Sequence, residues 1–223
     1  MITFNGISSD SIGVIVERMP NRYVPTRRFD PAAVAGRNGD VLRVDESFPN
    51  VTQEYEVYLS AESVGLPAVA RACAEWLCAP TGYARLTDSY DQTVFREAYL
   101  VDGFDIENVM NKFGRATISF SCKPQKYLLT GQYSTSALTV TNPTPFIARP
   151  LFTVSGSGTI TVNGKTITVL ETVTDFKIDC QTMNADDNTK ISCLDFPYLI
   201  GGENVITLDG ITSFSMIPRW WTL

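Results

Sequence analysis

Hydrophobic and polar residues alternate along most of the sequence, and this period of two predicts strands. The clearest run lies at 54–59, where Tyr55, Val57 and Leu59 alternate with more polar neighbours. Successive side chains of a strand point to opposite faces, so such a run predicts one buried face and one exposed face. On this basis we predict strands within 1–17, 41–60, 84–87, 94–101 and 116–122.

One segment has the period of a helix instead. Between Leu66 and Leu77, apolar residues recur at intervals of three, four and seven, which places them on one helical face. These residues are Leu66, Val69, Cys73, Trp76 and Leu77. Pro67 suits the first turn, and Pro80 lies where the helix should end. We interpret Trp76 as a core residue rather than as a platform that stacks on a ligand.

Residues 19–40 break the alternation. They contain Pro20, Pro25 and Pro31, followed by two glycines. Proline fixes φ and removes a backbone donor, so this segment does not fit the interior of a helix or a central strand. We predict an extended loop or arm here, and a β-hairpin that turns around 48–50.

The second half of the chain has the pattern of a small β-domain. Residues 131–145 have the Ser, Thr, Pro and Gly content of a junction, and short, evenly spaced strand signals follow. A hairpin is predicted across Asp209-Gly210. We therefore predict a mainly β protein with one α-helix and two domains, 1–137 and 138–223, the second a β-sandwich.

Asn163-Gly164 gives the strongest turn signal in the sequence. If these residues occupy a two-residue type I′ turn, Val162 faces Lys165 and Ile160 faces Ile167. This register sorts the apolar residues onto one face and four threonines onto the other. A slip of one residue would destroy that sorting, so we predict this register.

The residue types exclude several kinds of chemistry. The sequence contains no histidine, which excludes Ser-His-Asp and Cys-His catalysis and zinc sites that use histidine. The five cysteines are odd in number and form no C-x-x-C, so a closed disulfide framework or an ordinary cysteine zinc site is not expected. We interpret them as buried or half-buried free thiols.

Three short motifs resemble ligand sites but lack the required context. Gly164-Lys165-Thr166 looks like the end of a phosphate-binding loop, but a strand follows it rather than a helix. Gly156-Ser157-Gly158 lacks the third glycine and the helix of a dinucleotide site. Asp186-Asp187 lies in a polar loop, and we interpret it as a solvated turn rather than a calcium or glycosidase site. We predict no catalytic, cofactor-binding or metal-binding residues.

Charge is segregated along the chain. The net charge is −6, which argues against a nucleic-acid-binding surface. Residues 18–43, however, contain six arginines against Asp30 and Asp40, a local charge of +4, and the remainder therefore carries −10. This segment is either a solvated loop or an arm that docks on an acidic surface of its own or a neighbouring chain. The candidate contact residues are Arg22, Arg27, Arg28 and Arg37.

Two adjacent tryptophans, Trp220 and Trp221, lie near the end of the sequence. In an extended segment they point to opposite sides, so both cannot be buried against the same sheet. One reading is that one fills the core and the other packs on a neighbouring domain. The other is that the second contacts another chain or a sugar ring, at a peripheral site.

The sequence gives no sign of export or membrane insertion. Its first residues lack the basic and apolar regions of a signal peptide. No apolar run approaches the roughly 18 residues that a spanning helix needs. We therefore expect a protein that is made in the cytoplasm, with no membrane partner.

Taken in order, many short motifs resemble the distal tail proteins (Dit) of siphophages, which are also common in prophages of Gram-positive bacteria. In the first half they are Phe4-Asn5-Gly6, residues 13–17, Pro20, Arg22, Pro25, residues 36–40, Trp76-Leu77, residues 80–86, Asp88 and residues 120–124. In the second half they are residues 142–144, 149–151, 154–158, 178–180, Phe196-Pro197 and residues 201–204. The length resembles the short form, without an inserted carbohydrate-binding module.

This resemblance implies a structural hub at the tail tip of a virion, synthesised in the bacterial host. The N-terminal domain would form a homo-hexameric ring. Whether two such rings stack is left open. The ring would join the tail tube protein to the baseplate hub or tail-associated lysin. The C-terminal domain would be a galectin-like β-sandwich that anchors receptor-binding proteins, and DNA would pass through the ring without being specifically bound.

Alternatives from other classes remain at this point. A carbohydrate-binding module for host glycans would be monomeric and would need an exposed aromatic platform. A tail-tube protein would assemble into long tubes rather than stop at a ring. A glycoside or peptidoglycan hydrolase would need facing carboxylates, for which the sequence offers no candidate pair.

Overall fold

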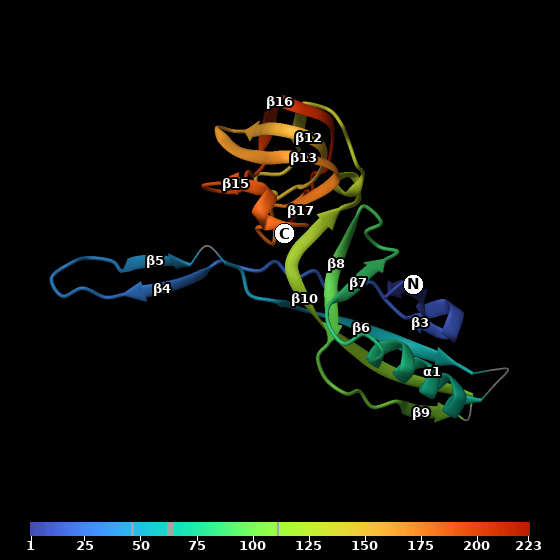
Figure 1. The fold of residues 1–223 in the computed structure, drawn as a ribbon. Helices are drawn as coiled ribbons and strands as arrows, with labels where there is room; N and C mark the ends of the chain where they lie inside the picture. Colours follow the sequence, from blue (N-terminus) through green and yellow to red (C-terminus); the bar gives the residue numbers. More distant parts are fainter. Residues whose placement is uncertain (46, 62–64, 111) are drawn as a thin grey trace. The chain divides into compact units, whose positions relative to one another are not determined.

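The computed structural model describes residues 1–45, 47–61, 65–110 and 112–223, and it divides the chain into two compact units (Figure 1). The first unit contains Met1–Lys126 and Leu223, and the second contains Tyr127–Thr222. The division thus precedes the predicted boundary at 137/138. Residues 127–137 belong to the second unit because the backbone of Thr135 bridges Met216 and the Arg219 amide donates to the Gly131 carbonyl at 2.7 Å.

One β-sheet, whose strands differ in length, forms most of the first unit. Its strand order is β2-β1-β7-β8-β10-β6-β3. Its strands are β1 (Ile2–Phe4), β2 (Ile7–Ser8), β3 (Val14–Val16), β6 (Val51–Ser60), β7 (Ala84–Asp88), β8 (Val94–Leu100) and β10 (Phe113–Leu128), with β9 (Glu107–Met110) beside β10. A 3₁₀ turn at Ser9–Ile12 connects β2 to β3. The predicted alternation in β6 is confirmed, since Tyr55, Val57 and Leu59 are all buried.

The helix α1 (Leu66–Cys78) packs its apolar face into the core of this sheet. All five residues predicted for that face are buried. Trp76 is 3% exposed, its ring meets Phe4 edge-on, and its indole N–H donates to the Phe4 carbonyl at 3.0 Å. Trp76 is therefore a core residue, as predicted, because a buried indole needs a partner for its N–H.

Residues 28–45 form a separate hairpin of two strands, β4 (Arg28–Ala32) and β5 (Val41–Asp45). The arm predicted for 19–40 is thus partly strand, and Pro31 is tolerated because neither strand is central in a sheet. The hairpin predicted around 48–50 is wrong. β5 pairs with β4, whereas β6 pairs with β10 on one edge and with β3 on the other.

The second unit is a β-structure built on three long strands, in the order β11-β16-β12-β13-β14. Its strands are β11 (Thr139–Asn142), β12 (Leu151–Val162), β13 (Lys165–Asp179), β14 (Asn184–Ala185), β15 (Ile191–Cys193), β16 (Gly202–Ile217) and β17 (Trp221–Thr222). Two 3₁₀ turns lie at Leu129–Gln132 and Asn188–Lys190. The predicted fold class, mainly β with one α-helix, is confirmed over the described residues.

The turn at Asn163-Gly164 has the predicted register. Val162 pairs with Lys165 and Ile160 with Ile167. Both turn residues have positive φ, 51° and 78°, as a type I′ turn requires. The apolar side of this hairpin lies in the core of the second unit.

The hairpin predicted across Asp209-Gly210 is wrong, because β16 is one continuous strand whose two halves both pair with β12. The Asp-Gly dipeptide forms part of a bulge opposite Gly156 and Gly158, where the register shifts. The two backbones approach so closely here that a Cβ on Gly158 would lie 2.0 Å from the Asp209 carbonyl oxygen. Position 158 therefore requires glycine, because any side chain there would collide with the backbone of Asp209 on β16.

The bulge provides a stability test. Gly158→Ala should lower the free energy of unfolding by ~2 kcal/mol or more beyond the loss in Gly164→Ala, since both positions have positive φ but only Gly158 faces a backbone atom. Urea unfolding followed by far-UV circular dichroism measures the difference. Equal losses in the two variants would contradict the close approach.

Candidate functional site

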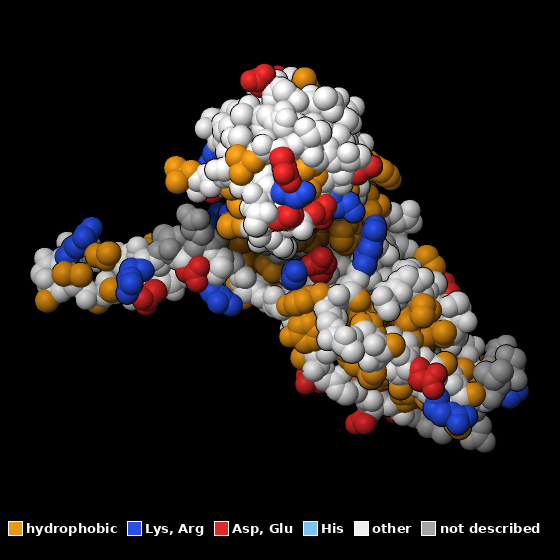
Figure 2. All heavy atoms as spheres, in the orientation of Figure 1, with side chains coloured by type: hydrophobic (Ala, Val, Ile, Leu, Met, Phe, Trp, Pro, Cys, Tyr) orange, Lys and Arg blue, Asp and Glu red, His pale blue; other side chains and the backbone are white. Residues whose placement is uncertain are grey.

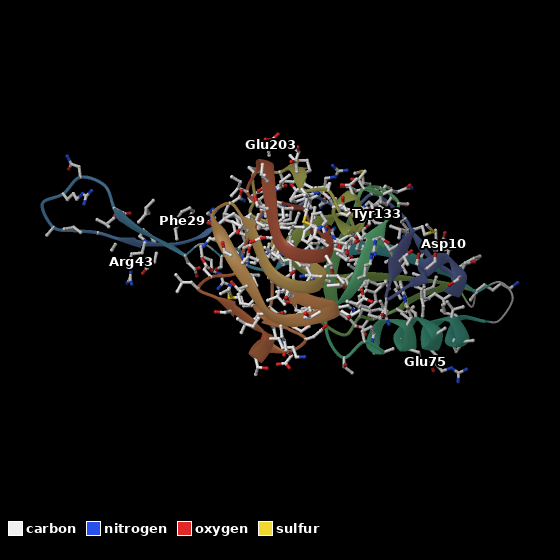
Figure 3. The ribbon with its side chains drawn as sticks, turned by 45° about the horizontal axis from the view of Figure 1, so that its top comes forward. Asp10, Phe29, Arg43, Glu75, Tyr133 and Glu203 are labelled. Carbon is white, nitrogen blue, oxygen red and sulfur yellow. The ribbon has the colours of Figure 1, made fainter. Side chains whose placement is uncertain are left out.

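The hairpin β4–β5 has two chemically different faces. Opposite residues of an antiparallel pair share a face, so the pairs Arg28–Asp45 and Asp30–Arg43 make one face charged. The other face carries Phe29, Pro31 and Leu42. Figure 2 shows apolar and basic side chains along this hairpin, and Figure 3 labels Phe29 and Arg43 on it.

The first strand and the tip of this hairpin are exposed. Every residue from 26 to 40 is exposed, including Phe29 at 52%, and Leu42 on the facing strand is 57% exposed. The ion pair between Arg43 and Asp30 spans 3.8 Å with both side chains at least 75% exposed, so it adds little stability. In the described part of the chain, no further strand pairs with the hairpin.

Three of the four predicted contact arginines lie on the hairpin or at its base. The Arg27 guanidinium lies over the Phe48 ring, 4.9 Å from its centre, and the Arg28 amide donates to the Ser47 carbonyl at 3.2 Å. Arg37 lies in the tip, where its amide donates to the Val34 carbonyl. The structure therefore presents these arginines on one exposed element.

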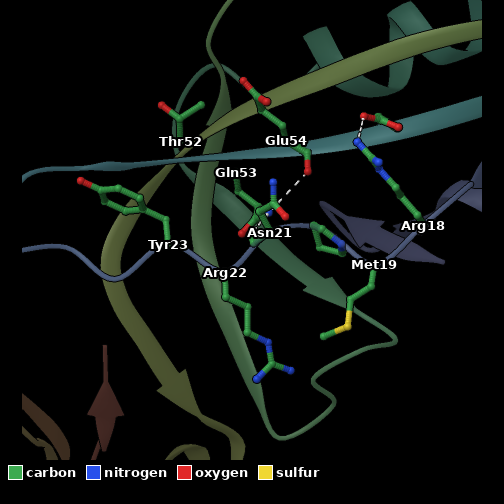
Figure 4. A pocket seen from close by; sticks show the side chains of 10 residues that line it. Arg18, Met19, Asn21, Arg22, Tyr23, Thr52, Gln53 and Glu54 are labelled. Atoms are coloured by element: carbon green, nitrogen blue, oxygen red, sulfur yellow. Dashed lines mark hydrogen bonds and ion pairs between the residues drawn. The ribbon is translucent and has the colours of Figure 1, made fainter.

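The fourth, Arg22, lies in a groove of about 260 Å³ between the segment that leads to the hairpin and β6 (Figure 4). Gln53, which is 3% exposed, donates to the Asn21 carbonyl at 3.2 Å and accepts from Arg96 at 3.1 Å. Arg18 forms an ion pair with Glu56. These contacts hold residues 18–21 against β6, and this segment leads to the base of the hairpin.

The cysteines are free thiols. Cys73, Cys122 and Cys180 are buried and Cys193 is half-buried, as predicted, but Cys78 is exposed because it ends α1 on the side away from the core. Burial raises the pKa of Cys73 and Cys122 to about 11 and that of Cys180 to about 12. These three thiols are therefore protonated at neutral pH and are poor nucleophiles.

The aspartates of the predicted solvated turn accept hydrogen bonds from their own turn and from the neighbouring strand β13. Asp187 accepts hydrogen bonds from the Thr189 amide and hydroxyl at 2.9 and 2.6 Å, and Asp186 accepts from the Lys177 amide at 2.9 Å. Across the residues that the structure describes, no three His, Cys, Asp or Glu side chains are grouped so that they could hold a metal ion. The same residues contain no helix of the length and apolar character that a bilayer span needs.

The two C-terminal tryptophans differ in their burial and in their contacts. Trp220 is 6% exposed and lies in the core of the second unit. Trp221 is half-buried, stacks on Phe146 with ring centres 4.4 Å apart, and donates from its indole N–H to the Ile147 carbonyl at 2.8 Å. The peripheral contact predicted for the pair can therefore involve only Trp221.

An ion pair that sequence reasoning missed holds this C-terminal segment. Arg219 donates to both carboxylate oxygens of Asp179, at 2.6 and 3.0 Å, and both side chains are mostly buried. Partial burial by itself would raise the pKa of Asp179, but the hydrogen bonds from Arg219 and from the Gln181 and Thr182 amides hold it below its ordinary value. No local motif signals this pair, because its members lie 40 residues apart.

No protein-family model and no curated protein matches this sequence. Among solved structures, the chain is similar to the Dit protein (gp 19.1) of phage SPP1, which is described as a paradigm of the hub adsorption apparatus in phages that infect Gram-positive bacteria. The two chains are 13% identical, and the match covers 100% of this chain and 98% of that one with a TM-score of 0.75. The chain therefore has a Dit-like fold over its full length.

The ion pair of Arg219 predicts a pH dependence. A carboxyl whose pKa is lowered on folding stabilises the protein above its unfolded value of about 4, and this contribution is lost as the pH falls through the folded value. Arg219→Gln should therefore cost about 1–3 kcal/mol of unfolding free energy at pH 7 and progressively less below pH 4. Urea unfolding at several pH values measures this, with the exposed Arg71→Gln as control. A cost that does not change with pH would contradict the assignment.

Proposed function

We propose that this chain is a structural hub protein of a bacteriophage or prophage tail tip, and not an enzyme. The observation that carries the proposal is the match to the Dit protein of SPP1 over essentially the full length of both chains. A full-length match supports a shared architecture of both units rather than one common domain. The order of Dit-like motifs along the sequence supports the same family.

The proposed hub is a ring of six copies, with stacked rings as a variant. Its first unit would form the ring and join the tail tube protein to the baseplate hub or tail-associated lysin. Its second unit would be galectin-like and would hold receptor-binding proteins at the periphery, where Trp221 is the candidate contact. In this proposal the chain is the short form, without an inserted carbohydrate-binding module. It is synthesised in the bacterial host and assembled into the tail tip of the virion.

The charge of the chain suits a conduit for DNA. Six copies would carry a net charge of about −36, from −6 for each copy. Phosphates are repelled by such a surface, so DNA would pass without being held. This argument supports passage rather than binding.

Arg22, Arg27, Arg28 and Arg37 would contribute to contacts between subunits of the ring. A head-to-tail contact needs two different complementary patches on each copy. Residues 18–43 carry a net charge of +4, and the rest of the chain is acidic. Arginine suits this task because its planar guanidinium pairs with carboxylates in a bidentate geometry.

The first test is the mass of the purified full chain by light scattering after size exclusion. A ring of six chains of 24.6 kDa has a mass of about 148 kDa, and a double ring has twice that. Either mass supports the hub. Open-ended tubes would favour a tail-tube protein instead, and a monomer at every concentration would overturn the ring and favour a carbohydrate-binding module, which a glycan array would then test.

Charge reversal tests the arginines. Arg28→Glu combined with Arg37→Glu should weaken ring assembly by about tenfold or more at low salt, and less at high salt, because salt screens contacts between exposed charges. Arg71→Glu on α1 is the matched control, since it makes the same change at another exposed arginine. Unchanged assembly of the double variant would remove these arginines from the contact.

A further inference from the structure

The chain contains three Asn-Gly dipeptides, and the structure places each of them in an exposed turn or bend. They are Asn5-Gly6, Asn38-Gly39 and Asn163-Gly164. A Cβ on any of the three glycines would meet no atom within 4 Å, so the three sites are equally open at the glycine. The contacts of the asparagine therefore distinguish one site from another.

An Asn-Gly dipeptide can react within its own backbone. The glycine amide nitrogen attacks Cγ of the asparagine carboxamide, which lies within reach in the same chain and which no glycine side chain shields. The N–Cγ bond forms, the Cγ–Nδ2 bond breaks, and Nδ2 leaves as ammonia with the proton that the glycine amide loses. Water then opens the cyclic imide at either carbonyl and leaves an aspartate or an isoaspartate. Asparagine is a thermolabile residue for this reason.

Asn163 is held against this reaction. Its Nδ2 donates to the Tyr198 carbonyl at 3.0 Å and to Oδ1 of Asn204 at 2.8 Å, and Asn204 is fully buried. Nδ2 can leave as ammonia only if both bonds break, and the buried Asn204 would then lose one of its donors. The backbone is fixed as well, because the turn has a φ of 51° at Asn163 and joins the paired strands β12 and β13.

Asn38 has none of these restraints. It lies in the tip of the hairpin, beyond the last ladder pair, Ala32 with Val41, and its φ is not positive. Its carboxamide forms no hydrogen bond with any residue that the structure describes. The backbone of Asn38 can therefore rotate to bring Cγ onto the Gly39 nitrogen without breaking a contact.

Asn5 is intermediate between these two sites. Its carboxamide also forms no hydrogen bond within the described part of the chain. Its backbone, however, has a φ of 50°, and its amide donates to the Arg85 carbonyl at 3.0 Å. Rotation of this backbone would break that bond.

We propose that Asn38 is the site at which this protein deamidates most rapidly, followed by Asn5, and that hydrogen bonds protect Asn163. Residues 28–45 hold three arginines and three aspartates and are therefore neutral. The reaction adds one carboxylate next to Arg37 and changes their net charge from 0 to −1. An isoaspartate also adds a methylene group to the backbone of the tip. The reaction needs only one chain, so this inference goes beyond the proposed ring.

The test is a peptide map by mass spectrometry of the full wild-type chain during incubation at mildly alkaline pH. The chain is diluted until light scattering shows a monomer. Each deamidated peptide gains the mass difference between water and ammonia. Asn38 should react about tenfold or more faster than Asn163, because only Asn163 must break two hydrogen bonds. The rate should rise with pH, because the attacking amide must lose its proton.

Unfolding supplies the main control. In guanidinium chloride the three sites should react at similar rates, because the denaturant removes every contact that separates them. Asn38→Gln is the matched variant, since it keeps the carboxamide but would have to form a larger ring. Modification at position 38 should almost disappear in this variant, while Asn5 and Asn163 keep their rates. If Asn163 reacts as fast as Asn38 in the folded chain, or if the difference persists in the denaturant, this inference fails. Neither result bears on the proposed ring.

Discussion

Backbone pairing along β6 is the constraint from which the first unit follows. Both edges of this strand are occupied, one by β10 over ten residues and the other by β3. The strand that precedes it in sequence, β5, therefore has no edge of β6 to join and pairs back onto β4. The main sheet buries its inner face under α1, whereas residues 28–32 of β4 are all exposed. One completed sheet thus leaves β4 and β5 as a separate two-stranded ribbon.

Much of the fold could be predicted where the signal is local. The helix follows from the spacing of Leu66 through Leu77, and the register of β12 and β13 follows from Asn163-Gly164 together with the sorting of apolar residues. The hairpin at Asp209-Gly210 could not be distinguished from a bulge, because the same dipeptide suits both. The glycines of β12, some 50 residues upstream, decide between them. Likewise, no local sequence pattern around β5 indicates that both edges of β6 are occupied by β10 and β3.

The sequence shows the arginines of this segment but not the hairpin that carries them. The excess of arginine in residues 18–43 indicated an arm, yet the prolines there concealed a strand and hence the division into an apolar and a charged face. Alternation predicted that both tryptophans could not be buried against one sheet, and the two do differ in burial. Which of them is buried depends on the packing of Trp220 against Gly131, a contact between residues 89 positions apart in the sequence.

The same contact at Gly131 has a consequence for how this architecture can change. The Leu128 amide donates to the Trp220 carbonyl at 2.9 Å, and the Arg219 amide donates to Gly131, so the chain enters and leaves the second unit at one place. A domain whose first and last residues lie close together can be inserted or exchanged as one piece. Recombination can replace it with a module whose ends lie equally close. The two units are thereby separable in a single genetic exchange.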